Sequence, residues 1–326
     1  MWDNLSLGYT ESPGHPLLRA EIARSYAGLG AEDVLVLAPE EGIYIAMHTL
    51  LAPGDEVIVI QPAYQSLHEI ARSIGCVVIP WELRAERAAR GNGRWGLDLA
   101  ALERAFSERT RLLVLNFPHN PTGFLPTHEE LDAVLGLARR WNVTVFSDEM
   151  YRLLEHRPEQ RLPAVCELYE QGISLSGMSK VYALPGLRIG WLATRIPGLV
   201  DRWQAFKDYT TICSSAPSEI LALIGLRSRD AILARNLAII HANLETARQF
   251  FRGDDRFAWY SPVAGSVAFP SWSGPGTVED FCQMAVEKAG VMIVPGSLFD
   301  HPGRHFRIGL GRRSFPEALP RLQGCL

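Results

Sequence analysis

An α/β fold is predicted for this chain, with a mostly parallel seven-stranded sheet, helices on both faces, and a smaller α+β domain toward the C-terminus. Two observations carry this prediction. Up to Pro197, short β-rich runs alternate with helical stretches, which is typical of a parallel sheet wrapped by helices. After Pro197 the composition becomes helical, and from about Phe257 short strand-like runs flank one more helix. The 326 residues are enough to bury a core in both parts.

The predicted strands are short apolar runs, which successive helical stretches separate. They span 33–37, 56–60, 76–80, 111–116, 143–147, 172–175 and 187–193. Residues 127–130 have the pattern of a capping box, and apolar residues recur at helical spacing from there to Trp141. Further helices are expected at 38–51, 221–226 and 230–251, and the last of these leads into the second part of the chain.

We therefore divide the chain into an N-terminal segment at 1–30, a large α/β domain at 31–235 and a small α+β domain at 236–326. In the small domain, strands are expected around 263–269 and 305–310, on either side of a helix at 278–289.

Composition disfavours several classes of partner. A formal net charge of −4 with dispersed arginines provides no basic field for nucleic acid. The five cysteines are widely spaced and form no Cys-x-x-Cys pair, so we expect reduced thiols and no metal site. No apolar run reaches the length of a membrane span and no cationic leader opens the sequence, so we expect a cytoplasmic protein.

Lys180 is the most informative residue, because it follows a predicted strand in the small-residue turn 176–180. The chain has only two other lysines, Lys207 and Lys288, so arginine carries the ordinary surface charge. A lysine amine can form a Schiff base, which a guanidinium cannot. The alternative is a solvated lysine in a turn.

Ligands of open parallel sheets bind beyond the carboxyl ends of the strands, and four predicted strands lead to reactive side chains there. An aromatic ring (Tyr64), an amide (Asn120), a carboxylate followed by a phenol (Asp148 and Tyr151) and an amine (Lys180) stand in those positions. This set suits a flat, anionic, heteroaromatic aldehyde, and pyridoxal 5'-phosphate (PLP) is such a molecule. Simpler interpretations stay open: a helix N-cap for Asp148, a turn for Asn120, and core packing for Tyr151.

Over about 5–319 the chain resembles the fold-type I PLP-dependent aminotransferases of class I/II. The resemblance rests on motifs that occur in the family's order: His119-Asn120-Pro121-Thr122-Gly123, Asp148-x-x-Tyr151, Ser179-Lys180 with Arg188, Gly290-Val291 with Pro295-Gly296, and Phe306-Arg307-Ile308. Each motif alone is weak, but the ordered set is specific. The resemblance implies amino-group transfer between an L-amino acid and a 2-oxo acid, through aldimine, quinonoid and ketimine intermediates.

The resemblance also implies roles for the residues around the cofactor ring. Lys180 holds the cofactor and then moves the substrate's proton. Asp148 pairs with the ring nitrogen and keeps it protonated, so that the ring accepts electrons from the substrate. Asn120 and Tyr151 hydrogen-bond the ring oxygen, and Tyr64 stacks on the ring.

The phosphate is expected at the start of the helix after Ala38, where backbone amides of Glu40 and Glu41 can donate, together with Ser179 and Arg188. The chain departs from the family pattern here. Pro39 has no N–H to donate, and Gly177 stands where a serine or threonine often serves the phosphate. An ordinary strand-surface arginine is the alternative interpretation of Arg188.

Arg307 is expected to clamp the substrate's α-carboxylate; an internal ion pair is the alternative. Tyr9 matches the tyrosine that reaches the phosphate of the neighbouring subunit, which implies a homodimer, although a plain surface aromatic is also possible. Family members commonly have some tens of residues before this tyrosine, so the N-terminal segment is expected to be a shortened one.

Regional runs such as 64–71 and 80–84 also resemble capreomycidine synthase, an aminotransferase-like enzyme that cyclises a modified arginine. A PLP-dependent lyase or cyclase of that type is therefore the second hypothesis. A non-catalytic, PLP-sensing domain is the third.

Overall fold

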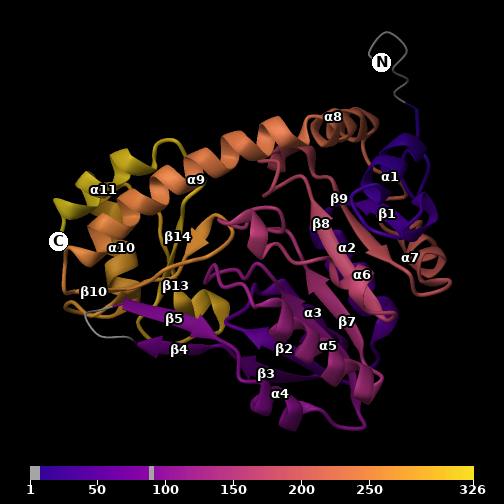
Figure 1. Cartoon of the computed structure of the whole chain (residues 1–326), viewed down its shortest axis with the longest axis horizontal. Helices are drawn as coiled ribbons and strands as arrows, with labels where there is room; N and C mark the ends of the chain where they lie inside the picture. Colours follow the sequence, from indigo (N-terminus) through magenta and orange to yellow (C-terminus); the bar gives the residue numbers. More distant parts are fainter. Residues whose placement is uncertain (1–7, 88–91) are drawn as a thin grey trace.

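The computed structural model describes residues 8–87 and 92–326. Within them, seven strands form one sheet in the order β1-β9-β8-β7-β6-β2-β3 (Figure 1). Their bounds are β1 Val34–Leu37, β2 Glu56–Gln61, β3 Val77–Glu82, β6 Thr110–Asn116, β7 Thr144–Asp148, β8 Gly172–Gly177 and β9 Gly190–Thr194. Only β9 is antiparallel to its neighbours, β1 and β8. The predicted mostly parallel sheet is thus confirmed.

Helices cover both faces of the sheet. One face packs against α2 (Pro39–Leu50), α3 (Ser66–Ile74) and α7 (Leu199–Lys207). The other packs against α1 (Pro16–Ala23), α4 (Leu99–Ala105), α5 (His128–Trp141), α6 (Val165–Leu168) and α8 (Ala216–Arg227). Because both faces are covered, β2 is buried at every position, as parallel strands usually are.

Local signals placed several elements correctly. Thr127 caps α5, accepting a hydrogen bond from the Glu130 N–H at 3.1 Å, while the Glu130 carboxylate accepts from the Thr127 N–H at 2.8 Å. Asn142 ends the helix in the left-handed region at φ 55°. The predicted capping box is therefore confirmed.

The strand predicted at 187–193 is wrong at its start. Pro185–Leu187 forms a 3-10 turn, η4, and Arg188 has the left-handed φ of 54°, so β9 begins only at Gly190. Proline fixes the first turn residue and Gly186 is a poor strand former, which together favour a turn over an extended run. Arg188 consequently lies in a turn at the sheet's edge and not on a strand surface.

The long helix α9 (Arg229–Arg252) runs from α8 to the C-terminal elements (Figure 1). Beyond it lie α10 (Val278–Ala289), α11 (Phe315–Gln323) and the short strands β10 (Phe257–Tyr260), β11 (Val267–Ala268), β12 (Ser271–Trp272), β13 (Val294–Pro295) and β14 (Phe306–Gly309). The predicted boundary at residue 235 falls inside α9, and the division into domains stays a prediction.

One connection between the large sheet's chain segment and the C-terminal elements has no signal in the sequence. The strands β4 (Arg84–Arg87) and β5 (Asn92–Gly96) form a hairpin, and β5 pairs in parallel with β10. The pairing of β5 with β10 is long-range in sequence. Next to it, Trp95 packs against Tyr260 with ring centroids 5.3 Å apart. No local period marks such a pair, because its stability comes from a partner more than 160 positions away.

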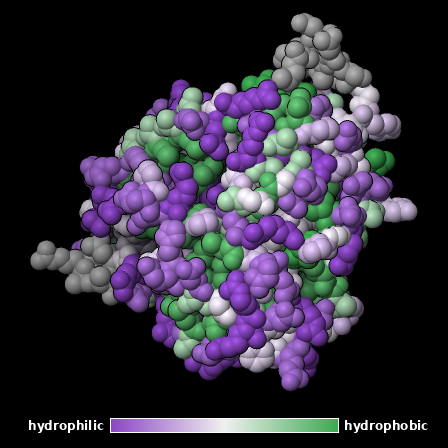
Figure 2. Space-filling view, turned by 45° about the vertical axis from the view of Figure 1, so that its right-hand side comes forward, coloured by the Kyte–Doolittle hydropathy of each residue, from purple (hydrophilic) through white to green (hydrophobic). Residues whose placement is uncertain are grey.

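Figure 2 shows hydrophilic side chains over much of one face, with hydrophobic patches between them. Among the described residues, no helix combines the length and the apolar character that crossing a membrane requires.

Candidate active site

The strands β8, β7, β6 and β2 are adjacent and parallel, so their carboxyl ends meet at one edge of the sheet. A cavity of about 250 Å³ lies there, between the strand ends, the start of α2 and β14. Nine of the eleven predicted site residues line it: Glu40, Tyr64, Asn120, Asp148, Tyr151, Ser179, Lys180, Arg188 and Arg307. The two that do not are Glu41 and Tyr9. The fold thus brings together residues that are up to 267 positions apart in the chain.

Asp148 is the last residue of β7 and is only 6% exposed. Its Oδ1 accepts a hydrogen bond from the Met150 N–H at 3.0 Å, and its backbone oxygen accepts one from Asn116 Nδ2 at 2.8 Å. Burial raises the pKa of the Asp148 carboxyl to about 6 and nearby Glu40 adds to this, while the Met150 N–H and Lys180 oppose it. No other hydrogen bond to this carboxylate occurs among the described residues, so it is a buried acceptor that a cationic N–H donor would satisfy.

Asn120 and Arg307 form a second polar pair in the cavity. The Asn120 N–H donates to Asn116 Oδ1 at 2.9 Å, and Arg307 Nη1 donates to Asn120 Oδ1 at 3.0 Å. The Arg307 guanidinium also lies over the Phe299 ring, 5.0 Å from its centroid. Within 8–87 and 92–326 no carboxylate pairs with Arg307, so the internal ion pair considered above is not found.

Asn116 is a site residue that the sequence analysis did not single out. It ends β6, is 2% exposed, and holds both Asn120 and the backbone of Asp148. The signal that could have found it is its position: a polar residue closes an apolar strand directly before the Phe117–Gly123 turn. A buried amide in such a place must satisfy its own donors and acceptors, and here it does so by fixing two neighbours.

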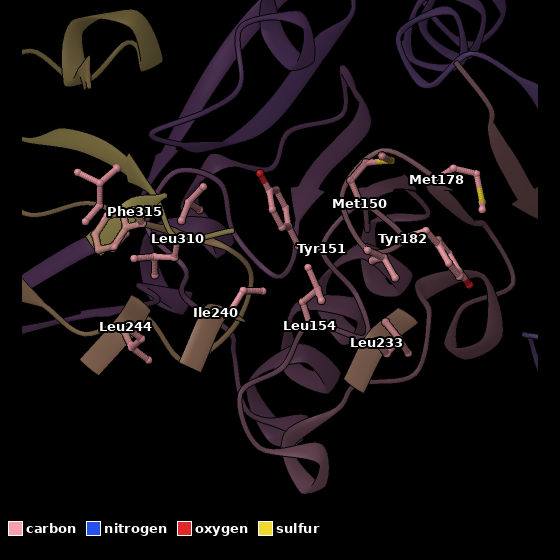
Figure 3. Packing of buried hydrophobic residues seen from close by; sticks show 14 of the residues in the cluster. Met150, Tyr151, Leu154, Met178, Tyr182, Leu233, Ile240, Leu244, Leu310 and Phe315 are labelled. Carbon is pink, nitrogen blue, oxygen red and sulfur yellow. The ribbon is translucent and has the colours of Figure 1, made fainter. Parts of the chain in front are cut away.

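Tyr151 is buried and lines the cavity. Figure 3 shows the ring between Leu310 on one side and Met150 on the other, with the hydroxyl pointing away from Leu154. Burial raises the pKa of the phenol to about 12, although Arg307 opposes the shift. The hydroxyl therefore stays protonated at neutral pH and can donate a hydrogen bond.

Lys180 lies three residues beyond the end of β8, lines the cavity and is exposed. Desolvation by the cavity walls lowers the pKa of its ammonium, Arg307 and Arg188 lower it further, and Asp148 opposes them. The turn that carries it is fixed by Met178, which is fully buried and whose N–H and C=O both bond to the chain at 2.9 Å. An amine with a lowered pKa on a rigid turn is suited to attack a carbonyl carbon.

The start of α2 forms the wall across from the strand ends. Its first backbone N–H groups have no intrahelical acceptors and so are free for an anion. The Glu41 carboxylate turns away, accepting from the hydroxyls of Thr210 and Thr211 at 2.6 and 2.8 Å. The Glu40 carboxylate does not: it accepts from the Tyr64 hydroxyl at 3.3 Å and from Ser66, and it lines the cavity.

The two departures from the family pattern in this wall have one packing explanation. A Cβ placed on Gly177 would lie 3.2 Å from the Pro39 ring and 2.9 Å from the Gly190 backbone. A Cβ on Gly190 would lie 2.7 Å from the same ring. The proline ring thus packs against the backbone of β8 and β9, and the Gly190 backbone lies too close to position 177 for a serine or threonine side chain to fit without a shift.

Arg188 and Tyr9 complete the predicted set. Arg188 donates to the Pro185 carbonyl at 3.2 Å, and among the described residues no carboxylate pairs with it. Tyr9 lies outside the cavity and is 90% exposed. The hydroxyl of the next residue, Thr10, donates a hydrogen bond to the Ser214 carbonyl at 3.3 Å.

Comparisons with known proteins agree with this geometry. The model of the family described as aminotransferase class I and II matches residues 4–314. Capreomycidine synthase of Streptomyces vinaceus is 32% identical over 316 residues, covering 94% of this chain and 77% of that protein.

Two solved structures have the same fold. The N-succinyldiaminopimelate aminotransferase of Mycobacterium tuberculosis has a TM-score of 0.88 at 28% identity, covering 98% of this chain and 86% of that one. The PLP-dependent cyclase OrfR has a TM-score of 0.88 at 28% identity, covering 99% and 85%. The chain therefore belongs to the aminotransferase class I and II family: it is a PLP-dependent enzyme of fold type I that moves an amino group between an L-amino acid and a 2-oxo acid.

Proposed function

We propose that Lys180 is the catalytic amine of this aminotransferase and that Asp148 sets the electronics of its cofactor. The observation that carries the proposal is that a lysine with a lowered pKa and a buried carboxylate share one cavity at the strand ends. When bound, PLP supplies an electron-withdrawing ring that stabilises the negative charge developing at the substrate's Cα. Lys180 Nζ would first hold the cofactor covalently, and then accept the Cα proton and return it as general base and acid.

The other polar side chains of the cavity would hold the ring. Asp148, with one oxygen bonded only to the Met150 N–H, would accept from the protonated ring nitrogen. Tyr151 and Asn120 would donate to the ring's hydroxyl oxygen, and Tyr64 would stack on its face. The donor and acceptor set of the cavity therefore fits the cofactor.

Across from the strand ends, the phosphate would be bound by backbone N–H groups of Glu40 and Glu41, the Ser179 hydroxyl and the Arg188 guanidinium. Arg307 would bind the α-carboxylate of the amino acid, since its guanidinium is free of carboxylates among the described residues. A second cavity of about 560 Å³ shares Tyr151, Lys180 and Arg307 with the first and offers space beside the reacting atoms.

Tyr9 would complete the phosphate site of a second subunit, which makes the functional unit a homodimer. Its 90% exposed ring supports this proposal, because the side chain is available to another chain. Sedimentation of the purified protein tests it, and a monomer with full cofactor affinity would contradict it. We also propose a cytoplasmic location, in keeping with the free thiols of all five cysteines.

The assignment of Lys180 is tested by reducing the holoenzyme with borohydride and mapping the modified peptide by mass spectrometry. We expect the cofactor's mass on Lys180, and loss of the absorbance change that an amino donor otherwise produces. Modification of Lys207 or Lys288 instead would overturn the assignment.

A second candidate function is cyclisation or elimination on a modified amino acid, as the names of two relatives suggest: capreomycidine synthase and the PLP-dependent cyclase OrfR. The same cofactor chemistry serves these reactions. Incubation with an amino acid panel and mass analysis of products separates the two. A cyclic product without accumulation of the aminated cofactor would favour the cyclase.

A further inference from the structure

Arg307 reaches the cavity from β14, and the contacts that aim its guanidinium come from outside that strand. Asn120 accepts its Nη1 hydrogen bond at 3.0 Å, and the Phe299 ring lies 5.0 Å below the guanidinium carbon. Phe299 is 4% exposed and packs edge-on against Phe269, with centroids 5.9 Å apart. The ring is therefore a fixed platform under a cation.

The backbone of Phe299 is itself tied to the large sheet. Phe299 ends the short 3-10 helix η5 (Gly296–Phe299), and its carbonyl accepts a hydrogen bond from the Ala63 N–H at 3.1 Å. Ala63 directly precedes Tyr64 of the cavity wall. The platform thus bridges β14 and the segment that follows β2.

The next residue, Asp300, contacts α3 through its side chain. Asp300 has the left-handed φ of 52°, and its Oδ2 lies 3.0 Å from Arg72 Nη1 and 3.3 Å from His68 Nε2. Arg72 Nη1 also bonds to the Glu69 carboxylate. The His68 side chain is fully buried and burial lowers its pKa, so Arg72 is the cation that holds Asp300 at neutral pH.

We infer that Asp300 and Phe299 are positioning residues for Arg307: the contact of Asp300 with α3 fixes the end of η5, and the Phe299 ring at that end aims the guanidinium at the substrate's carboxylate. The inference rests on the proposed role of Arg307 as the carboxylate clamp. Neither residue lines the cavity, so neither contacts the reacting atoms directly.

The test compares two substrates in one holoenzyme: the best amino donor of a panel, and the amine that lacks only its α-carboxylate. The ratio of their kcat/KM values measures carboxylate recognition. Asp300→Asn, which tolerates a left-handed φ, should lower the ratio about fivefold through KM, and Phe299→Leu about tenfold. The control Asp230→Asn removes an exposed partner of Arg229 on α9 and should leave the ratio unchanged.

Two results overturn the inference: both variants retain the wild-type ratio, or both lose activity equally toward the amino acid and the amine. Arg307→Gln identifies which idea failed. If Arg307→Gln also leaves the ratio unchanged, the proposed clamp is wrong. If it lowers the ratio while Asp300→Asn and Phe299→Leu do not, the clamp stands and the positioning role is wrong.

Discussion

The strand-end wall of the cavity and the wall formed by α2 and the turn that carries Lys180 differ in how exposed their polar side chains are. At the strand ends, Asp148, Asn120 and Tyr151 are each at most 8% exposed, and hydrogen bonds from neighbouring backbone or side chains hold the first two. On the other wall, Tyr64 is 39% exposed, and Lys180 and Arg188 are exposed as well. The strand-end wall, here called the inner wall, is preorganised. The opposite wall, here called the outer wall, is completed by its ligand.

This difference separates two kinds of cost. Holding a carboxylate such as Asp148 in a buried place without a cationic partner destabilises the empty protein, and the bound cofactor would relieve that cost. Leaving Arg188 in a solvated turn costs the fold little, but its contact with a phosphate must be formed on binding. Substitution of Asp148 on the inner wall should therefore change the stability of the empty protein, whereas substitution of Arg188 on the outer wall should mainly change cofactor affinity.

The largest effect is expected for Lys180→Arg, which keeps the positive charge but removes the nucleophilic amine. The rate of the first half-reaction should fall by about a thousandfold or more. Single-turnover absorbance measurements check this, with Lys288→Arg on α10 as the control for loss of a lysine. A variant that retains a tenth of the rate would contradict the assignment.

Asp148→Asn should separate activity from stability on the inner wall. The folded-state pKa of about 6 lies above the ordinary value of 3.8, so the cofactor-free wild type loses stability as pH rises between those values. Above pH 6 the neutral variant should be more stable by about 3 kcal/mol, and the advantage should vanish below pH 4.

Urea unfolding of the cofactor-free proteins at pH 8 and pH 4 measures this difference, and Asp201→Asn on the exposed side of α7 serves as the control. Activity of Asp148→Asn should fall about a hundredfold or more, because an amide does not keep the ring nitrogen protonated. Equal stability of variant and wild type at pH 8 would mean that the carboxylate is not strained in the empty protein.

Arg188→Ala should act on the outer wall and spare stability. The dissociation constant of PLP should rise about tenfold to a hundredfold, the scale of one charge-assisted contact. Pyridoxal, which has no phosphate, should bind the variant and the wild type equally in a fluorescence titration. The result for Arg229→Ala on α9 controls for the lost charge. If pyridoxal binding weakens as much as PLP binding, Arg188 does not serve the phosphate.

The smallest effect is expected for Glu40→Gln. The amide oxygen can still accept from the Tyr64 and Ser66 hydroxyls, while the negative charge leaves the cavity. PLP should bind about twofold to threefold more tightly, with a matched control in Glu103→Gln, an exposed residue paired with Arg140. Weaker binding would show that the carboxylate serves the site in the ionised form.

Local sequence signals predicted much of the site because its residues follow strand ends. Apolar runs fixed where the strands lie, and in adjacent parallel strands the positions just beyond their carboxyl ends converge whatever the side chains are. This is why the sequence alone groups Asp148, Asn120 and Lys180. Asn116 was missed since its importance lies in two hydrogen bonds and not in a motif.

By itself, the sequence determined the alternation of strands and helices, the capping of α5 and the chemical types gathered at the sheet's edge, because these follow from periodicity and from neighbours a few residues apart. The tertiary structure decided that Glu40 lines the cavity, that Pro39 rests on Gly177, that β5 pairs with β10 and that Arg72 meets Asp300. These contacts join distant parts of the chain. Their geometry depends on the packing of all the elements against one another, so no local sequence pattern predicts it.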